Sequence, residues 1–253
     1  MRSILIAFSM YSKIPVPQIP WDERSLSRAL CAFPLVGAVI GAILYGWLRL
    51  SAALDLGALG AAGALVIPMA LSGGIHMDGF CDSCDALASH QSRERKLEIL
   101  KDSHTGAFAI ICCGIYLLLF YGAWCEADFN RGTLALAMMP ILSRSLSATA
   151  AVFFRNARGS GLLAAFTKPM DARLARVLLP VFAAASAAGM ILAAPAAGAA
   201  AVISAAAVFP WYRWMAYRQF GGITGDTEGF FLQICECVMV ISFVLAQKAG
   251  ALL

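Results

Sequence analysis

Long apolar runs alternate with short polar stretches along most of the chain. A helix that spans a bilayer needs about 20 mainly apolar residues. Seven segments approach this length, and we predict a spanning helix in each of them: 30–50, 57–73, 105–125, 133–154, 176–194, 196–216 and 230–250. The second is short and rich in glycine. The fifth and sixth are rich in alanine and meet near Ala194 and Pro195, which predicts a tight helical hairpin.

The composition also indicates a membrane protein. Hydrophobic residues make up 60% of the 253 residues, charged residues make up 13%, and the mean hydropathy is +0.77. Soluble globular domains are about 45–50% apolar and about 25% charged. Because the polar stretches are too short for a soluble domain, we predict an all-α helical bundle that forms one membrane-embedded domain over residues 1–253.

The distribution of charge predicts an orientation for these spans. Lys and Arg concentrate in cytoplasmic loops. With a cytoplasmic N-terminus, the external segments contain only Arg49, Arg131 and Lys248, Arg144 lies within a span, and the other 15 of the 19 basic residues are cytoplasmic. We therefore expect the polar regions 74–104, 155–175 and 217–229 on the cytoplasmic face of the cell inner membrane. The basic residues are scattered over several loops, which indicates contact with anionic lipid and argues against a nucleic-acid partner.

The most distinctive polar motif is GGIHMDGFCDSCD over residues 73–85. Its carboxylates Asp78, Asp82 and Asp85 are spaced i, i+4 and i+7, so a helix would place them on one face. Such carboxylates repel one another unless a cation lies among them, and Mg²⁺ is usually held by one or two carboxylates plus substrate phosphates. We therefore predict a magnesium site, with a solvated acidic face as the alternative. His76 has three open roles: metal ligand, proton carrier or structural hydrogen-bonding partner.

A second glycine-rich acidic motif, GGITGDTEGF over residues 221–230, echoes the first, although the match is too short to establish a repeat. Glycine lets the backbone approach a phosphate or a metal closely. Asp226 and Glu228 are therefore candidate metal ligands, and Thr224 is a candidate substrate contact. The alternative is an ordinary flexible turn.

Lys101 and Asp102 precede the third predicted span. Lys101 could neutralise phosphate charge, and the free N–H groups at the start of the next helix would attract an anion. The alternative is an ordinary pair on the surface.

Four further charges are candidates for the site. Arg144 and Glu236 lie inside predicted spans, where ionisable residues are functional candidates by default. Arg144 could pair with Glu236 or grip a phosphate. Of Arg155 and Arg158, we interpret one as a substrate contact and the other as a basic flank of the span, without assigning which is which.

Together these motifs resemble the cobalamin synthase family, the adenosylcobinamide-GDP ribazoletransferases. The resemblance covers nearly the whole chain. It includes FSMYSKIPVP at 8–17, FPLVG at 33–37, the aspartate motif, Lys101-Asp102-Ser103 with Gly106, and GITGD at 222–226. The family usually has Gly where this chain has Ala86, and Ala where it has Cys81.

The resemblance implies an enzyme that joins adenosylcobinamide-GDP to α-ribazole or its 5′-phosphate and releases GMP, with Mg²⁺ as the metal. On this hypothesis a ribose hydroxyl attacks the phosphorus attached to cobinamide. The metal ligands would be Asp78, Asp82, Asp85, Asp226 and Glu228. The catalytic residues would be His76, Asp82, Lys101 and Asp102. The substrate contacts would be Arg144, Arg155, Arg158 and Thr224.

Two other classes of protein share part of the pattern. A CDP-alcohol phosphatidyltransferase also uses aspartates beside the membrane, but its Asp-Gly-x-x-Ala-Arg pattern is missing after Asp78. A transporter would place its charges near the midplane, whereas most of the charges here lie in predicted cytoplasmic loops. A homo-oligomer stays an open alternative.

Overall fold

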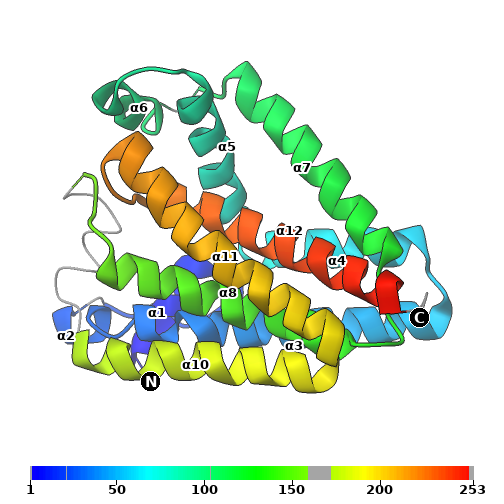
Figure 1. Cartoon of the computed structure of the whole chain (residues 1–253). Coiled ribbons are helices and arrows are strands. Elements are labelled where there is room, and N and C mark those ends of the chain that lie inside the picture. Colours follow the sequence, from blue (N-terminus) through cyan, green and yellow to red (C-terminus); the bar gives the residue numbers. More distant parts are fainter. Residues whose placement is uncertain (1, 21, 103, 159–171, 251–253) are drawn as a thin grey trace.

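The structure, a computed structural model, describes residues 2–20, 22–102, 104–158 and 172–250 as a bundle of packed helices (Figure 1). The elements are α1 (Arg2–Tyr11), α2 (Glu23–Leu26), η1 (Leu30–Ala32), α3 (Phe33–Leu54), α4 (Ala58–Leu71), α5 (Ile75–Ala88), α6 (Arg93–Ile99), α7 (Ala107–Glu126), α8 (Thr133–Phe153), α10 (Ala172–Ala193), α11 (Pro195–Phe220) and α12 (Gly225–Gly250). The described residues form no β-strand, only one isolated bridge between Asn156 and Ile223. The predicted all-α class is therefore confirmed.

Six helices in the described ranges are long and apolar enough to cross a bilayer: η1 joined to α3, α7, α8, α10, α11 and α12. Each coincides with one of the predicted spans. The remaining prediction, 57–73, corresponds to α4, whose 14 residues are too few to span alone. The helix α5 follows it after a bend of 92°, so the chain has six spans, or seven if α4 and α5 together count as one.

The contacts of α4 and α5 show that the pair runs alongside α7 from one end of the bundle to the other. At the start of α4, Trp47 Nε1 donates to the Gly60 carbonyl over 2.8 Å, and a Cβ on Gly60 would lie 3.2 Å from the Phe129 ring, just beyond the end of α7. Near the end of α5, Asp85 accepts hydrogen bonds from the backbone at the start of α7. The two helices together therefore extend along the length of α7, which is itself long enough to span.

Two glycines cause the bend. Gly73 and Gly74 have φ values of +67° and +76°, a left-handed backbone that glycine adopts without a steric penalty. The structure therefore corrects the predicted loop over 74–104: its first half is the helix α5, and the acidic motif lies on it. The reason is that α5 also carries an apolar face, on which Met77, Phe80 and Cys84 are buried.

The helices α3 and α8 pack unusually closely through a Gly-x-x-x-Gly pair, Gly37 and Gly41. A Cβ on Gly37 would lie 2.3 Å from the Pro140 carbonyl oxygen, and one on Gly41 would lie 2.1 Å from that of Ala137. Small residues of this kind let membrane helices approach backbone to backbone. This contact fixes the position of α8, and the chain that follows α8 leads into the site.

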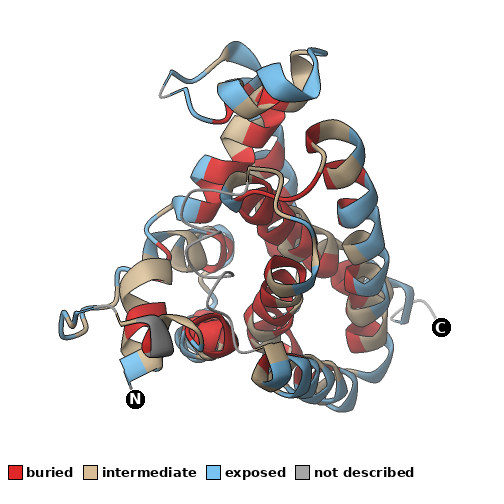
Figure 2. Cartoon of the chain, turned by 90° about the vertical axis from the view of Figure 1, so that its left-hand side faces the viewer, coloured by how far each residue is buried: buried red, intermediate tan, exposed pale blue. Residues whose placement is uncertain are grey.

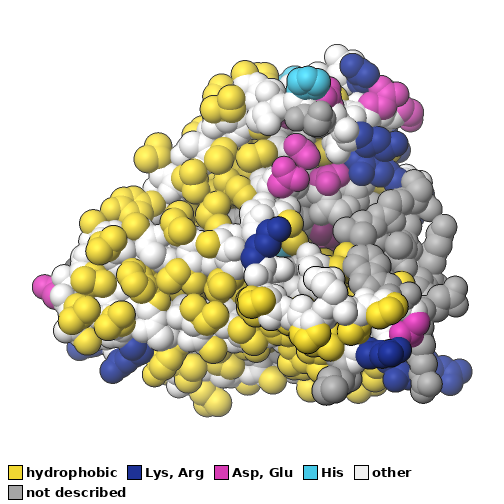
Figure 3. Space-filling view, turned by 180° about the vertical axis from the view of Figure 1, so that it is seen from behind, with side chains coloured by type: hydrophobic (Ala, Val, Ile, Leu, Met, Phe, Trp, Pro, Cys, Tyr) yellow, Lys and Arg dark blue, Asp and Glu magenta, His cyan; other side chains and the backbone are white. Residues whose placement is uncertain are grey.

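The predicted hairpin between the fifth and sixth spans is confirmed, because α10 ends at Ala193 and α11 begins at Pro195. The buried residues line the inward faces of the helices and the exposed ones lie outside (Figure 2). Many exposed side chains are apolar, including Leu118 at 74% and Leu192 at 82% exposure, and hydrophobic side chains cover most of the face in Figure 3. These surfaces suit contact with lipid.

Candidate active site

A cavity of about 300 Å³ lies among α1, η1, α5, α8 and α12. Its polar wall combines acids, one arginine and neutral hydrogen-bonding groups: His76, Asp78, Ser147, Asn156, Arg158, Thr224, Asp226 and Glu228. Its apolar wall includes Tyr11, Leu30, Phe33, Ile75, Ala151 and Leu232. The structure thus brings residues from all three predicted polar regions into one cavity.

The first turn of α12 belongs to this cavity and is fixed by a reciprocal cap. The Thr224 hydroxyl accepts from the Thr227 backbone N–H over 3.2 Å, and the Thr227 hydroxyl accepts from the Thr224 N–H over 2.8 Å. This pairing satisfies backbone donors at the helix start, as a capping box does. The predicted candidate Thr224 therefore lines the cavity and also starts the helix that carries Asp226.

A short backbone bridge brings Arg158 to the same place. The Ile223 N–H donates to the Arg155 carbonyl, and the Ala157 N–H donates to the Ile223 carbonyl, each over 2.9 Å. The bridge ties the chain leaving α8 to the turn before α12. Arg158 Nη2 then lies 3.2 Å from Asp226 Oδ2, and the Arg158 side chain is 19% exposed. The cavity thus contains a guanidinium beside a carboxylate.

The two glycine-rich motifs pack against each other where α5 crosses α12. A Cβ on Gly79 would lie 2.7 Å from the Asp226 carbonyl oxygen, and a Cβ on Gly229 would lie 2.8 Å from that of His76. The rings of Phe80 and Phe230, which follow these glycines, stack with centroids 5.5 Å apart. This close crossing places Asp78 and Asp226 in one wall.

The acidic residues form a group with excess negative charge. As predicted, Asp78, Asp82 and Asp85 all lie on one helix. The carboxylates of Asp78, Asp226 and Asp85 repel the carboxylate of Asp82, and the Arg158 guanidinium attracts it. Asp82 does not line the cavity, but the charges of the cavity residues act on it. A bound cation would relieve this repulsion.

Asp85 has a contact that the spacing did not predict. Its two carboxylate oxygens accept from the backbone N–H groups of Gly106, over 2.6 Å, and Ala109, over 2.8 Å. These donors belong to the start of α7, where N–H groups have no partner within the helix. Asp85 therefore anchors α7 to α5, and it does not line the cavity.

Glu228 lies in the cavity wall one turn beyond the start of α12. Its side chain accepts hydrogen bonds from the hydroxyls of Ser147, over 2.5 Å, and Tyr212, over 3.0 Å. The residue is only 7% exposed. Hydrogen bonds to both oxygens hold the carboxylate in place in the wall.

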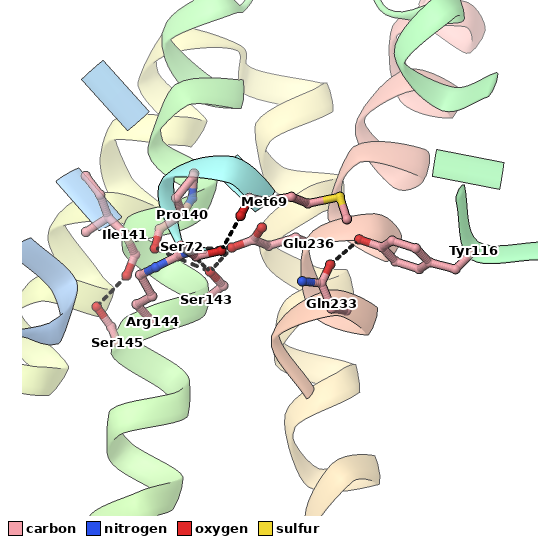
Figure 4. Close-up of polar contacts among 10 residues, drawn as sticks. All are labelled: Met69, Ser72, Tyr116, Pro140, Ile141, Ser143, Arg144, Ser145, Gln233 and Glu236. Carbon is pink, nitrogen blue, oxygen red and sulfur yellow. Dashed lines mark hydrogen bonds and ion pairs between the residues drawn. The ribbon is translucent and has the colours of Figure 1, made fainter. Parts of the chain in front are cut away.

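Arg144 and Glu236 form a buried ion pair deeper in the bundle (Figure 4). Arg144 Nη1 lies 2.7 Å from Glu236 Oε1, which also accepts from the Ser143 hydroxyl over 2.6 Å. Of the two alternatives for Arg144, the structure therefore favours the pair with Glu236. Neither residue lines the main cavity, so the predicted substrate contact of Arg144 does not match its position.

Arg155 also lies outside the cavity lining. Its Nε donates to the Gly221 carbonyl over 2.8 Å, and its guanidinium lies 5.5 Å from the centre of the Tyr217 ring. Arg155 thus fastens the end of α8 to the end of α11, because Gly221 directly follows α11. Of the two arginines left unassigned by the sequence, Arg158 is the one in the cavity.

Lys101 and Asp102 lie on the exposed connection between α6 and α7 and do not line the cavity. Asp102 accepts from the His104 N–H over 3.0 Å, and its Oδ1 lies 2.7 Å from His104 Nδ1. These hydrogen bonds lower the pKa of Asp102. The structure therefore separates this pair from the polar wall. Ser103, which lies between Asp102 and His104 in the sequence, is outside the described residues.

The carboxylates fit a magnesium ion whose remaining ligands come from water and from the phosphates of the substrate. In the described part of the chain, no three His, Cys, Asp or Glu side chains converge closely enough to hold a metal on their own. Mg²⁺ seldom uses such a protein cage, since one or two carboxylates, waters and substrate phosphates usually complete its shell. Asp78 and Asp226 supply hard oxygen donors in one wall, with Asp82 close by.

Several cavity residues were not predicted as site residues. Tyr11 and Phe33 fall in stretches that carried the family resemblance, but nothing in their local pattern indicated a role. Ser147, inside the fourth predicted span, and Asn156, just beyond it, gave no signal either. The apolar wall combines residues of α1, η1, α3, α5, α8 and α12, and its position depends on tertiary packing that spacing along the chain does not encode.

Comparison with known proteins identifies relatives over nearly the full length. A model of the cobalamin-5-phosphate synthase family matches residues 3–244. A curated adenosylcobinamide-GDP ribazoletransferase from Lachnoclostridium phytofermentans is 42% identical over 248 residues, which cover 98% of this chain and 95% of the relative. Proteins with the same name from Pseudomonas paraeruginosa and Clostridium botulinum are 33% and 31% identical, over 97% and 96% of this chain and 98% and 97% of their own lengths.

No solved structure shows a significant match to this chain. The family match and the relatives agree with the resemblance drawn from the motifs. Because the match spans almost all of the sequence, the chain belongs to the cobalamin-5-phosphate synthase family.

Proposed function

We propose that this membrane protein is an adenosylcobinamide-GDP ribazoletransferase, which joins the GDP-activated corrinoid to α-ribazole or its 5′-phosphate in cobalamin synthesis. The names of the relatives supply the substrates. The observation that carries the proposal is the convergence of Asp78, Asp226, Glu228 and Arg158 in one cavity. Carboxylates beside a guanidinium are the groups that phosphoryl transfer needs.

The reaction exchanges one bond to phosphorus for another. A ribose hydroxyl oxygen of α-ribazole attacks the phosphorus attached to cobinamide and forms a new P–O bond. The P–O bond to the bridging oxygen of the pyrophosphate breaks, and GMP leaves with that oxygen. The hydroxyl proton passes to a base in the site, so a phosphodiester replaces the pyrophosphate linkage.

The charged residues of the wall would divide the work. Asp78, Asp226 and Asp82 would hold Mg²⁺, and the Glu228 carboxylate would add negative charge near them in the same cavity. When bound, Mg²⁺ neutralises charge on the two phosphates. Arg158 would donate to a phosphate oxygen, since its fork-shaped guanidinium suits such an acceptor. The first turn of α12, which lines the same wall, favours an anion at its N-terminus.

His76 is the proposed proton acceptor. It lines the cavity, it is only 7% exposed, and its Nε2 has no hydrogen-bond partner among the described residues. A neutral imidazole nitrogen without a partner can accept a proton from an attacking hydroxyl.

The proposal is tested with purified protein, Mg²⁺, adenosylcobinamide-GDP and α-ribazole. We expect GMP release that requires both substrates and the metal. Asp226→Asn and Asp78→Asn should each lower turnover at least about 100-fold, because each removes a charged ligand of the proposed metal. The matched control is Glu98→Gln, which changes an exposed acid paired with Arg95 on α6.

Two results would contradict this function: no GMP release from folded wild-type protein, or near-normal turnover from both aspartate variants. Release of GMP from adenosylcobinamide-GDP in the absence of α-ribazole would point instead to hydrolysis.

We also infer that the cavity faces the cytoplasm from the cell inner membrane. The support is the excess of Lys and Arg in the segments at the cavity end, against Arg49, Arg131 and Lys248 in the segments at the other end. The fusion experiment described below tests this orientation.

A further inference from the structure

We infer that the cavity is the acceptor pocket: it binds the nucleoside α-ribazole with its aromatic base against the apolar wall, while the corrinoid stays outside. This inference rests on the proposed function and adds which of the two substrates the cavity takes. It also assigns a specificity role to Tyr11, Phe33, Leu30 and Ala151.

The first argument is size. A cavity of about 300 Å³ lies at the lower limit of sites that enclose small molecules. A nucleoside is of that scale, whereas a corrin ring with its adenosyl and nucleotide parts is several times larger. Only the acceptor can therefore be enclosed, and the donor can reach the polar wall only with its pyrophosphate.

The second argument is the chemistry of the apolar wall. The Tyr11 and Phe33 rings have centroids 4.4 Å apart, and Leu30, Ala151 and Leu232 complete the wall. Of these five side chains only Tyr11 has a polar atom. Dimethylbenzimidazole, the base of α-ribazole, carries two methyl groups and no exocyclic donor, so only its one free ring nitrogen needs a hydrogen-bond partner.

The same wall discriminates against guanine, the base of the other nucleotide in the reaction. Guanine has an amino group, a ring N–H and a carbonyl oxygen that need partners. Against Leu30, Phe33 and Ala151 most of these groups would be buried without hydrogen bonds, which is unfavourable. The wall therefore favours the acceptor's base over that of the donor.

The polar wall completes the fit. With the base against these apolar side chains, the ribose hydroxyls would face Asp78, Asn156 and Asp226, which line the same cavity. That is where the proposed metal and Arg158 would hold the pyrophosphate. One binding mode thus brings the attacking oxygen to the phosphorus.

The test uses Ala151→Val, which narrows the cavity at its apolar wall. It compares two acceptors, the riboside of 5,6-dimethylbenzimidazole and the riboside of unmethylated benzimidazole. We expect the ratio of kcat/KM for the methylated over the unmethylated acceptor to fall about tenfold, the usual effect of one or two methyl groups in a pocket. The KM for adenosylcobinamide-GDP should stay within about twofold of the wild-type value. The matched control is Ala184→Val, the same substitution at an exposed position on α10.

An unchanged ratio in Ala151→Val, or a rise in the KM for the corrinoid nucleotide alone, would overturn the inference. General damage to the fold lowers both rates and leaves the ratio where it was. If the wild type uses neither riboside, the proposed function itself is wrong. This outcome differs from an unchanged ratio, which contradicts only the assignment of the cavity to the acceptor.

A measurement on the wild type is independent of any variant. Calorimetry should show α-ribazole binding to the enzyme without the corrinoid, and an equal concentration of guanosine should not displace it. Displacement by guanosine, or no binding of α-ribazole, would assign the cavity to something other than the acceptor.

Discussion

Arg155 and Arg158 lie three positions apart but have different partners. Arg158 faces Asp226 in the cavity, whereas Arg155 donates to the Gly221 carbonyl outside it. The sequence predicts that one of them contacts substrate without assigning which. Which of the two lies in the cavity depends on the bridge between Arg155, Ala157 and Ile223, which joins segments more than 60 residues apart.

Changing both arginines separates these roles. We expect Arg158→Gln to raise the KM for adenosylcobinamide-GDP and lower kcat/KM about 10- to 100-fold, since a charged hydrogen bond contributes about 1.5–3 kcal/mol. Arg155→Gln should instead lower the thermal midpoint. Steady-state kinetics and thermal unfolding in detergent measure the two effects. An equal rise in KM from both variants would place Arg155 in the binding site after all.

Asp85 has contacts that spacing along the chain does not indicate. Its position at i+7 from Asp78 predicts a metal ligand, and its carboxylate accepts from the N–H groups of Gly106 and Ala109. The position of α7 relative to α5 determines these contacts, and helical periodicity within the motif contains no information about it.

The Asp85→Asn variant tests the anchoring role. An amide offers one acceptor oxygen to two N–H groups, so we expect unfolding to become easier by about 1–3 kcal/mol. The Mg²⁺ concentration for half-maximal GMP release should not change. A tenfold higher Mg²⁺ requirement would show that Asp85 is a metal ligand as predicted.

At the scale of elements, hydrophobic length predicted most of the architecture. Six of the seven predicted spans correspond to helices long enough to cross a bilayer. The remaining segment failed as a single span because Gly73 and Gly74 turn the chain, and the polar residues of α5 hid the helix that continues it. Runs of apolar residues identify helices that face lipid, but not a short helix whose one apolar face packs against other helices.

The crossing of α5 and α12 depends on the absence of a side chain at Gly79. In Gly79→Ala the new Cβ would lie 2.7 Å from the Asp226 carbonyl oxygen, so the helices must separate. We expect at least about a tenfold loss of turnover, because misplacement by about 1 Å commonly has a larger effect. The thermal midpoint should fall as well.

Gly114→Ala on α7 is the matched control, since a Cβ there has no atom within 4 Å. It should keep its activity and unfold no more easily, because alanine favours a helix more than glycine does. Equal losses in the two variants would rule out the crossing as the cause.

At the scale of the whole molecule, an orientation follows from counting the bent pair as one span. Seven spans with a cytoplasmic N-terminus place the C-terminus and Lys248 outside. We therefore expect a phosphatase that works only outside the cytoplasm to be active when fused after residue 250 and inactive when fused after residue 90, between α5 and α6. The reverse pattern would contradict this orientation, and activity at both points would contradict the count of five spans between them, which are α7, α8, α10, α11 and α12.

The contact between Gly79 and Asp226 joins positions 147 residues apart, and α12 is the last helix of the bundle. A ribosome completes α5 when about two thirds of the chain is still to be made. Until α12 has entered the membrane, the acidic helix can pack on α7 but not on α12, and Asp78 has no Asp226 beside it. The site can therefore assemble only after α12 has been made, so a chain interrupted before residue 225 leaves an inert fragment rather than a partly active enzyme.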